Sequence, residues 1–295
     1  MSVFSCFLRR VAYLLIFSSY FLACAPKQIV ISTSNYLPLA VTESFIVIPE
    51  DDPVDLSNEE VIGEIKLKDN GLSLICNYET IVALATKEAR QMGANCIQIY
   101  EHRVPDMVST CHRIKARAIR LKNVRPFEKE IVWHPGRRLE LMDFKGKTEN
   151  RPFQAATVGA IRYNYLAAPL ASKFTFQVET IFDCRTSYFK EGINTEQTLA
   201  HEQGHFDMTE LYARKYLKAI QEQVHDLKEL EKNHAKIYQG ILESLYLEQD
   251  KYDTEIYADR SKQKAWLLTI REALTSLDAY SDKKIQIPVN NKGKG

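Results

Sequence analysis

Residues 199–214 read L-A-H-E-Q-G-H-F-D-M-T-E-L-Y-A-R and contain an H-E-x-x-H pattern, with His201 and His205 four positions apart. In an α-helix, residues i and i+4 lie one turn apart on the same face, so both imidazoles can face one metal ion. Residues 195–248 contain no proline and predict a long helix around this pattern. The stretch therefore predicts a helix that carries two histidine ligands.

The residue types in this pattern suit hydrolysis at zinc. Histidine nitrogens bind Zn²⁺ at about 2.0–2.1 Å, and zinc lowers the pKa of water to about 7 while it polarises a substrate carbonyl. Glu202 follows His201 by about 100° around the helix, near the ion but not bound to it. Its carboxylate can take a proton from the water and pass it to a leaving amine. The pattern predicts Zn²⁺ as the cofactor and Glu202 as the general base.

Gly204 lies inside the pattern, where glycine weakens a helix by roughly 1 kcal/mol relative to alanine. A residue with that cost predicts the close approach of another element at this point. The alternative is a pair of solvated or capped histidines on an ordinary helix, because bare H-E-x-x-H patterns also arise by chance.

The third ligand has to come from further along the chain. His225 and His234 follow on the same predicted helix, and a rise of 1.5 Å per residue puts His225 about 30 Å from His205. We expect instead that a second helix returns antiparallel to the first and brings Glu255 beside the two imidazoles.

Three more residues of the helix are candidates for an outer layer of the site. Asp207 lies on the opposite helix face from His205 and is expected to support the metal ligands from outside or to act as a capping group. Thr209 shares the metal face. Tyr212, one turn beyond, fits a packing role or contact with a tetrahedral oxyanion.

Residues 201–214 closely resemble the H-E-Q-x-H-F-D-I-x-E-x-x-A-R block of a bacterial family catalogued as domain of unknown function nine-two-two, described as predicted secreted zinc-dependent proteases. Residues 141–146, L-M-D-F-K-G, are similar to that family's W-x-D-F-x-G block. The resemblance spans about residues 131–275. It implies a zincin-like α+β domain that hydrolyses peptide bonds.

The same family has a Y-D-x-E-T-x-H-G block that falls on residues 252–259. This chain has Ala258 and Asp259 where the block has histidine and glycine. If that histidine is the family's third ligand, this chain has lost it. Then Glu255 substitutes for it, or the site is weakened or inert.

The first part of the chain predicts a small α+β domain over residues 24–123. Its expected elements are an alternating strand, an amphipathic helix that ends at Gly93, and two more strands, at residues 61–67, 78–92, 96–100 and 114–121. Residues 88–97, E-A-R-Q-M-G-A-N-C-I, resemble the A-x-x-x-G-A-N-A-I signature of YbjQ-like and Rcs-lipoprotein-like modules. That resemblance implies sensing or docking and no chemistry.

Residues 1–23 predict a lipoprotein signal peptide. Arg9 and Arg10 precede an apolar run over residues 11–23, which is shorter than the roughly 20 residues of a transmembrane helix. The F-L-A-C sequence at residues 21–24 resembles a bacterial lipobox. That resemblance implies a lipid on Cys24 that attaches the protein to a membrane of the cell envelope, which we expect to be the outer membrane. The alternative is an ordinary secretory signal cleaved near Ala23.

Four cysteines follow the lipobox: Cys76, Cys96, Cys111 and Cys184. None lies in a C-x-x-C pair, which disfavours a cysteine zinc knuckle. Export places them in an oxidising compartment, where pairs can form disulfides. Spacing leaves the connectivity open, and a bridge between Cys76 and Cys111 is preferred because they flank the helix-and-strand unit.

The chain has 295 residues, 45% of them hydrophobic and 26% charged, which suits two ordinary folded domains. Its net charge of +1 gives no electrostatic reason to expect nucleic acid as a partner. A boundary is predicted at residues 123–130. The second domain is expected over residues 124–280, and the basic residues 281–295 are predicted to be disordered.

The predicted architecture is thus a small N-terminal α+β domain followed by a zincin-like α+β domain with a long metal-binding helix. The leading hypothesis is an exported, lipid-anchored zinc metallopeptidase that acts on a peptide or protein substrate. The alternative is a non-catalytic envelope lipoprotein, with a structural or degenerate metal site and an N-terminal domain that senses or docks a partner.

Overall fold

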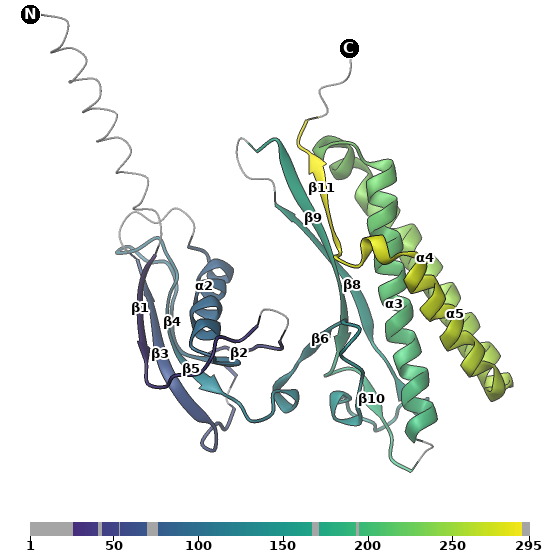
Figure 1. Ribbon diagram of the computed structural model, residues 1–295, viewed down its shortest axis with the longest axis horizontal. Helices are drawn as coiled ribbons and strands as arrows, with labels where there is room; N and C mark the ends of the chain where they lie inside the picture. The colour runs from purple at the N-terminus through teal and green to yellow at the C-terminus, as the bar shows by residue number, and fades with distance from the viewer. Residues whose placement is uncertain are drawn as a thin grey trace, which may run out of the picture. The chain divides into compact units, whose positions relative to one another are not determined.

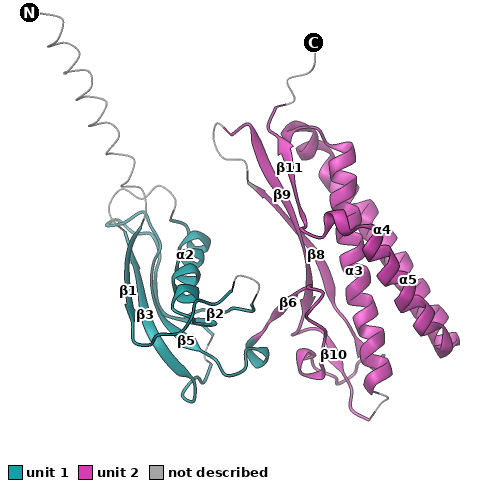
Figure 2. Cartoon of the chain, in the orientation of Figure 1, with its two compact units in different colours: residues 1–127 teal, residues 128–295 magenta. Residues whose placement is uncertain are grey.

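The chain divides into two compact units, residues 1–127 and 128–295, in the computed structural model (Figure 2). Their boundary falls inside the predicted segment 123–130. The structure describes residues 26–40, 43–52, 54–69, 76–166, 171–192 and 195–290. The predicted signal peptide and Cys24 lie outside these residues. No helix in the described part of the chain is both long and apolar enough to cross a membrane.

In the described residues, unit 1 is a five-stranded sheet with one helix (Figure 1). The helix and three of the strands lie where the sequence predicts them, whereas strands Lys27–Ser32 and Ile46–Ile48 were not predicted. The strand order is β1-β3-β5-β4-β2, and all neighbours are antiparallel except β2 and β4. Helix α2 buries Ile81, Ala85 and Ala89 in the same core as the sheet. The elements are β1 Lys27–Ser32, β2 Ile46–Ile48, β3 Glu60–Lys68, α2 Tyr78–Gln91, β4 Cys96–Arg103, β5 Arg113–Arg120 and the 3-10 turn Arg125–Phe127.

The predicted disulfide between Cys76 and Cys111 is confirmed. It joins the segment before α2 to the connection between β4 and β5, and Cys111 is fully buried. Cys96 and Cys184 are free thiols and are also buried. A disulfide of this kind persists in oxidising compartments and is consistent with export.

Unit 2 is a layer of helices on a sheet (Figure 1). Strand β9 is central, with β8 along one edge and β11 and β6 along the other. Helix α3 packs on this sheet, and α4 and α5 pack on α3. The elements are β6 Glu130–Val132, β7 Ala155–Ala156, β8 Gly159–Leu166, β9 Lys173–Asp183, β10 Tyr188–Phe189, α3 Thr195–Gln223, α4 Leu227–Ala258, α5 Gln263–Ser276 and β11 Lys284–Pro288, with 3-10 turns Leu141–Asp143, Arg260–Lys262 and Asp278–Tyr280.

Two sequence-based expectations about unit 2 are wrong. The predicted unbroken helix over residues 195–248 is two helices, because Asp226 caps the second one by accepting a hydrogen bond from Glu229 N at 2.9 Å. Residues 284–288 of the predicted disordered tail form β11, which pairs with β9. Ile287 of that strand is buried in the main core, so the tail gains an apolar contact that composition alone does not reveal.

Removing the disulfide should destabilise unit 1 selectively. The Cys76→Ser, Cys111→Ser double variant should lose about 2–4 kcal/mol of unit 1 unfolding free energy, because the bridge closes a loop across a sequence separation of 35 residues. Urea unfolding followed by hydrogen exchange of β3 and β5 amides measures this loss. Cys184→Ala in unit 2 is the control and should leave unit 1 unchanged.

Candidate metal centre

Three potential ligands converge in unit 2. Helix α3 supplies His201 and His205, whose Nε2 atoms lie 3.1 Å apart. Helix α4 supplies Asp253, whose Oδ1 lies 2.9 Å from His201 Nε2 and 3.0 Å from His205 Nε2. Among the described residues, these three form the one group of histidine, cysteine and acidic side chains placed to hold a metal ion.

The separations of the three atoms suit a metal ion between them. Ligands at about 2.0–2.1 Å from a tetrahedral zinc lie roughly 3.3 Å from one another. Two imidazoles and a carboxylate are also a three-ligand set of the kind that catalytic zinc sites use, with the fourth position left for water or substrate. The same set suits non-haem iron. The residues present therefore fit a divalent transition metal.

The charge of the centre favours the same conclusion. Burial alone would raise the pKa of Asp253, but its contacts with His201 and His205 lower the pKa well below its usual value. Asp253 is therefore ionised at neutral pH, which is the state in which a carboxylate binds a metal.

Asp253 takes the place that the sequence predicted for Glu255. The antiparallel return of a second helix is confirmed, because Asp253 lies beside His201 while Gln249 lies beside Thr209, further along α3. Residues 253 and 255 are about 200° apart around a helix, so only one of them can face α3. The Glu255 carboxylate accepts a hydrogen bond from Trp266 Nε1 at 3.1 Å instead. The prediction of Glu255 as third ligand is therefore corrected to Asp253.

Gly204 allows the two helices to approach each other. A Cβ atom at this position would overlap the hydroxyl of Tyr252 and lie 2.9 Å from its ring carbon Cζ. The Tyr252 ring stacks on His201 with centroids 4.6 Å apart, and its hydroxyl donates to the His201 carbonyl at 3.2 Å. The close approach that Gly204 predicts is confirmed, and it orients one ligand directly.

Glu202 is buried beside the ligands. Burial raises its pKa above the usual range, against the opposing charge of His205. Its Oε2 atom and His201 Nδ1 have no hydrogen-bond partner in the described part of the protein. The first of these is a buried acceptor that water at the centre would satisfy. The second lacks the outer hydrogen bond that metal-bound histidines normally make.

A cleft of about 520 Å³ opens next to the centre. His201 and Glu202 form part of its wall, so a bound molecule would reach both. Its other walls come from the segment before β7, from the start of α3 and from the end of α4. They include Phe153, Gln154, Thr198, Ile256, Tyr257 and Arg260. Sequence analysis assigned none of these residues to the site. Phe153 and Gln154 are distant in sequence from the H-E-x-x-H pattern, and Thr198, Ile256 and Tyr257 lie near motif residues without matching a motif position themselves.

The three candidate outer residues have different roles. Asp207 faces away from the imidazoles, as its position predicts, and accepts hydrogen bonds from Trp133 Nε1 at 2.8 Å and Gln203 Nε2 at 2.7 Å. Asp207 thus links the face of α3 opposite the imidazoles to Trp133, the residue after β6, and does not contact the two histidine side chains. Thr209 donates to the His205 carbonyl at 2.9 Å. Tyr212 belongs to the hydrophobic core, in agreement with its packing interpretation.

A buried ion network, which sequence analysis missed, holds the next turns of α3. Glu210 is fully buried, accepts from Thr180 on β9 at 2.7 Å and pairs with Arg214 at 3.0 Å. The spacing of Glu210 and Arg214 by four residues was the available signal. Because these groups are buried and paired, the register of α3 on the sheet is fixed one to three turns from the ligands.

Comparison of the chain with protein families, with curated proteins and with solved structures found no match. The case for a metal centre therefore rests on the residues described above. The resemblance of residues 201–214 to a protease family remains an expectation from the sequence.

Substituting the glycine in the motif should disturb the centre. Gly204→Ala improves helix propensity by about 1 kcal/mol, yet the added methyl group would collide with Tyr252, and overpacking usually costs about 1–3 kcal/mol. The net effect should be a loss of up to about 2 kcal/mol of stability. Gly240→Ala on α4 is the matched control, because a Cβ there meets nothing within 4 Å, and it should stabilise. Thermal unfolding of both variants checks the opposite signs.

Replacing each of two acidic residues on α4 should have different effects on the affinity of the protein for zinc. Asp253→Ala should weaken zinc binding by roughly 100-fold or more, since even outer partners of zinc ligands are typically worth 10–100-fold. Glu255→Ala should bind zinc as the unsubstituted protein does. Titration against a competing zinc chelator measures both affinities. Equal losses in the two variants would contradict the assignment of Asp253.

Proposed function

We propose that this protein is an exported zinc-dependent metallopeptidase of zincin-like type. The observation that supports it most is the position of Glu202. A buried carboxylate with an unsatisfied oxygen lies next to the two imidazoles and the aspartate, and it faces an open cleft. A metal centre that only stabilised the fold would be closed by a fourth protein ligand and would need no such group.

The roles of the residues follow from their positions. Zinc in a site of this kind supplies an acidified water and a positive charge that polarises a substrate carbonyl. Glu202 accepts the proton of the attacking water and returns it to the leaving amine. Its raised pKa, caused by burial, makes it a better proton acceptor than an exposed glutamate. The hydrogen bond from Thr157 to the Glu202 carbonyl, at 3.2 Å, holds that turn of α3.

The lining of the cleft beside the centre supports a polypeptide substrate. Phe153, Ile256 and Tyr257 offer apolar surface, while Gln154 and Arg260 offer polar contacts. Such a mixture suits a chain that carries both side chains and amide groups. The disulfide of unit 1 supports export, and attachment through a lipid on Cys24 is part of the proposal.

The competing function is a non-catalytic envelope lipoprotein with a structural metal. Metal analysis of the purified protein, followed by a screen against a broad peptide library with and without chelator, separates the two. Zinc near one equivalent together with chelator-sensitive cleavage supports the peptidase. Tightly held zinc with no turnover supports the structural role, and iron in place of zinc would argue against hydrolysis.

Replacing the general base should separate catalysis from metal binding. Glu202→Gln keeps the size of the side chain and removes its ability to accept a proton, so peptide cleavage should fall by about 10²–10⁴-fold. Zinc content should stay near that of the unsubstituted protein, because Glu202 is not one of the three converging ligands. Asp253→Ala, the comparison variant, should lose both peptide cleavage and bound zinc. Undiminished cleavage by Glu202→Gln would remove Glu202 from the mechanism.

A further inference from the structure

One end of the unit 1 sheet carries a cluster of basic residues. The strand registers pair Lys27 on β1 with Lys68 on β3, and Arg103 on β4 with Arg113 on β5. Leu67, next to Lys68, pairs with Ile114, next to Arg113, so the two pairs lie at the same end. Neighbouring strands are about 4.8 Å apart, so the four residues lie within a width of roughly 15 Å.

The loop that leaves this end exposes apolar side chains. Residues 104–108, here called the apolar loop, follow β4 with the sequence V-P-D-M-V. Met107 is fully exposed, Val108 is 90% exposed and Val104 is 60% exposed. Single exposed apolar residues are common on protein surfaces, but three neighbouring ones with this much exposure are typical of an interaction surface.

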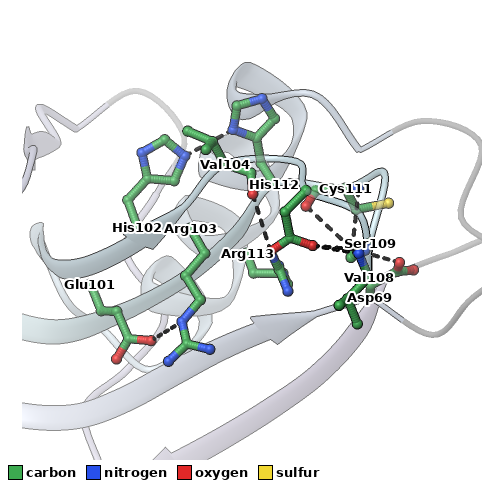
Figure 3. A network of polar contacts seen from close by, with 11 residues as sticks. Asp69, Glu101, His102, Arg103, Val104, Val108, Ser109, Cys111, His112 and Arg113 are labelled. Carbon is green, nitrogen blue, oxygen red and sulfur yellow. Dashed lines mark hydrogen bonds and ion pairs between the residues drawn. The ribbon is translucent and has the colours of Figure 1, made fainter.

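The apolar loop is held in shape by polar contacts at its base (Figure 3). Asp106 accepts hydrogen bonds from Val108 N and Ser109 N, both at 2.9 Å, and its other oxygen pairs with Arg113 at 2.6 Å. Ser109 donates to Asp69 at 2.7 Å, and Cys111 is tied down by the disulfide. A loop fixed in this way presents its apolar tip without an ordering cost on binding.

The surface around the loop favours an anionic partner. Lys27 and Lys68 are exposed and make no ion pair with another described residue, whereas Arg103, whose side chain is 63% exposed, pairs with Glu101 at 2.8 Å. Each acidic residue near this end already has a partner: Asp106 pairs with Arg113, Glu101 pairs with Arg103 and Lys115, and Asp69 accepts from Ser109. Apolar tips flanked by lysine and arginine are the composition of membrane-surface segments.

The chain itself connects this end to the predicted anchor. Cys24 is the third residue before Lys27, and three residues span at most about 11 Å. A lipid on Cys24 would therefore enter a bilayer close to the basic end of the sheet. A protein partner would have no such reason to meet this end in particular.

We propose that the apolar loop and the basic end of unit 1 form a membrane-docking surface. Met107, Val108 and Val104 enter the interfacial region of the bilayer, while Lys27 and Lys68 face anionic lipid headgroups. Docking gives the protein a second contact with the membrane, in addition to the lipid on Cys24. It also fixes the orientation of unit 1 on the membrane, which a single flexible tether does not do. The proposal does not depend on peptidase activity, but its choice of a membrane as the partner rests on the lipid at Cys24 that the proposed function includes.

Tryptophan substitution tests the insertion of the loop. The full chain with Met107→Trp is reconstituted with vesicles of phosphatidylglycerol that carry brominated acyl chains. The added emission should shift to the blue and be largely quenched, and the effect should shrink in phosphatidylcholine vesicles. Leu37→Trp is the matched control, because Leu37 is 87% exposed and lies beside Gly93, at the opposite end of the same sheet. Its emission should stay that of a water-exposed indole.

Charge reversal tests the basic end. Each lysine near an anionic surface contributes about fivefold to binding, so the Lys27→Glu, Lys68→Glu double variant should shift the docking equilibrium by roughly 30-fold or more. In the Met107→Trp background this appears as lost quenching. The control reverses Lys87 on α2 and Lys122, which follows β5 at the opposite end of the sheet, and should leave quenching unchanged.

Several results would overturn the proposal. One is an indole at position 107 that stays as exposed as the one at 37 on anionic vesicles, or a chain that does not stay with the vesicles. Another is equal quenching after reversal of Lys27 and Lys68. Protection of position 107 only when other envelope proteins are present would identify a protein partner instead.

Discussion

The candidate metal centre depends on the contact between Tyr252 and the backbone of α3 at Gly204. Without a side chain at 204, the tyrosine ring lies against His201 and its hydroxyl reaches the His201 carbonyl. Asp253 is the next residue in sequence, so the contact that positions Tyr252 also places a carboxylate between the two imidazoles. A glycine that weakens its own helix thus allows the third candidate ligand to reach the two imidazoles.

The opposite face of α3 shows why the motif region is rich in polar residues although it is buried. Gln203 accepts from the Leu139 amide at 2.8 Å, Asp207 accepts from Trp133, and Glu210 accepts from Thr180 on β9. Each of these buried side chains therefore forms a hydrogen bond with a different segment of unit 2. The helix is held from behind by hydrogen bonds and from the front by Tyr252, which leaves the imidazoles little freedom to move apart.

Local spacing made part of this structure predictable. The histidine pair, the close approach at Gly204 and the helix of unit 1 follow from residues near one another in sequence. The choice between Asp253 and Glu255 does not, because it depends on how α4 is rotated. That rotation follows from the residues that α4 buries, Leu230, Leu245, Tyr252 and Ile256. Strand β11 was missed for a similar reason. Its two alternating isoleucines become informative only beside the free edge of β9.

The two units depart from ordinary folding rules in opposite ways. Unit 2 buries Glu202 with an unsatisfied oxygen, whereas unit 1 exposes Met107 and Val108 on a loop made rigid by Asp106 and a disulfide. Each arrangement costs stability in an isolated chain, and each would be relieved by the proposed ligand: a metal with its water in one case, a bilayer in the other. Sites where a sequence breaks local rules, while its surroundings hold the break in place, are where function is expected. The rigidity around both departures is therefore the strongest reason to interpret them as functional, since a tolerated defect would have no need of such support.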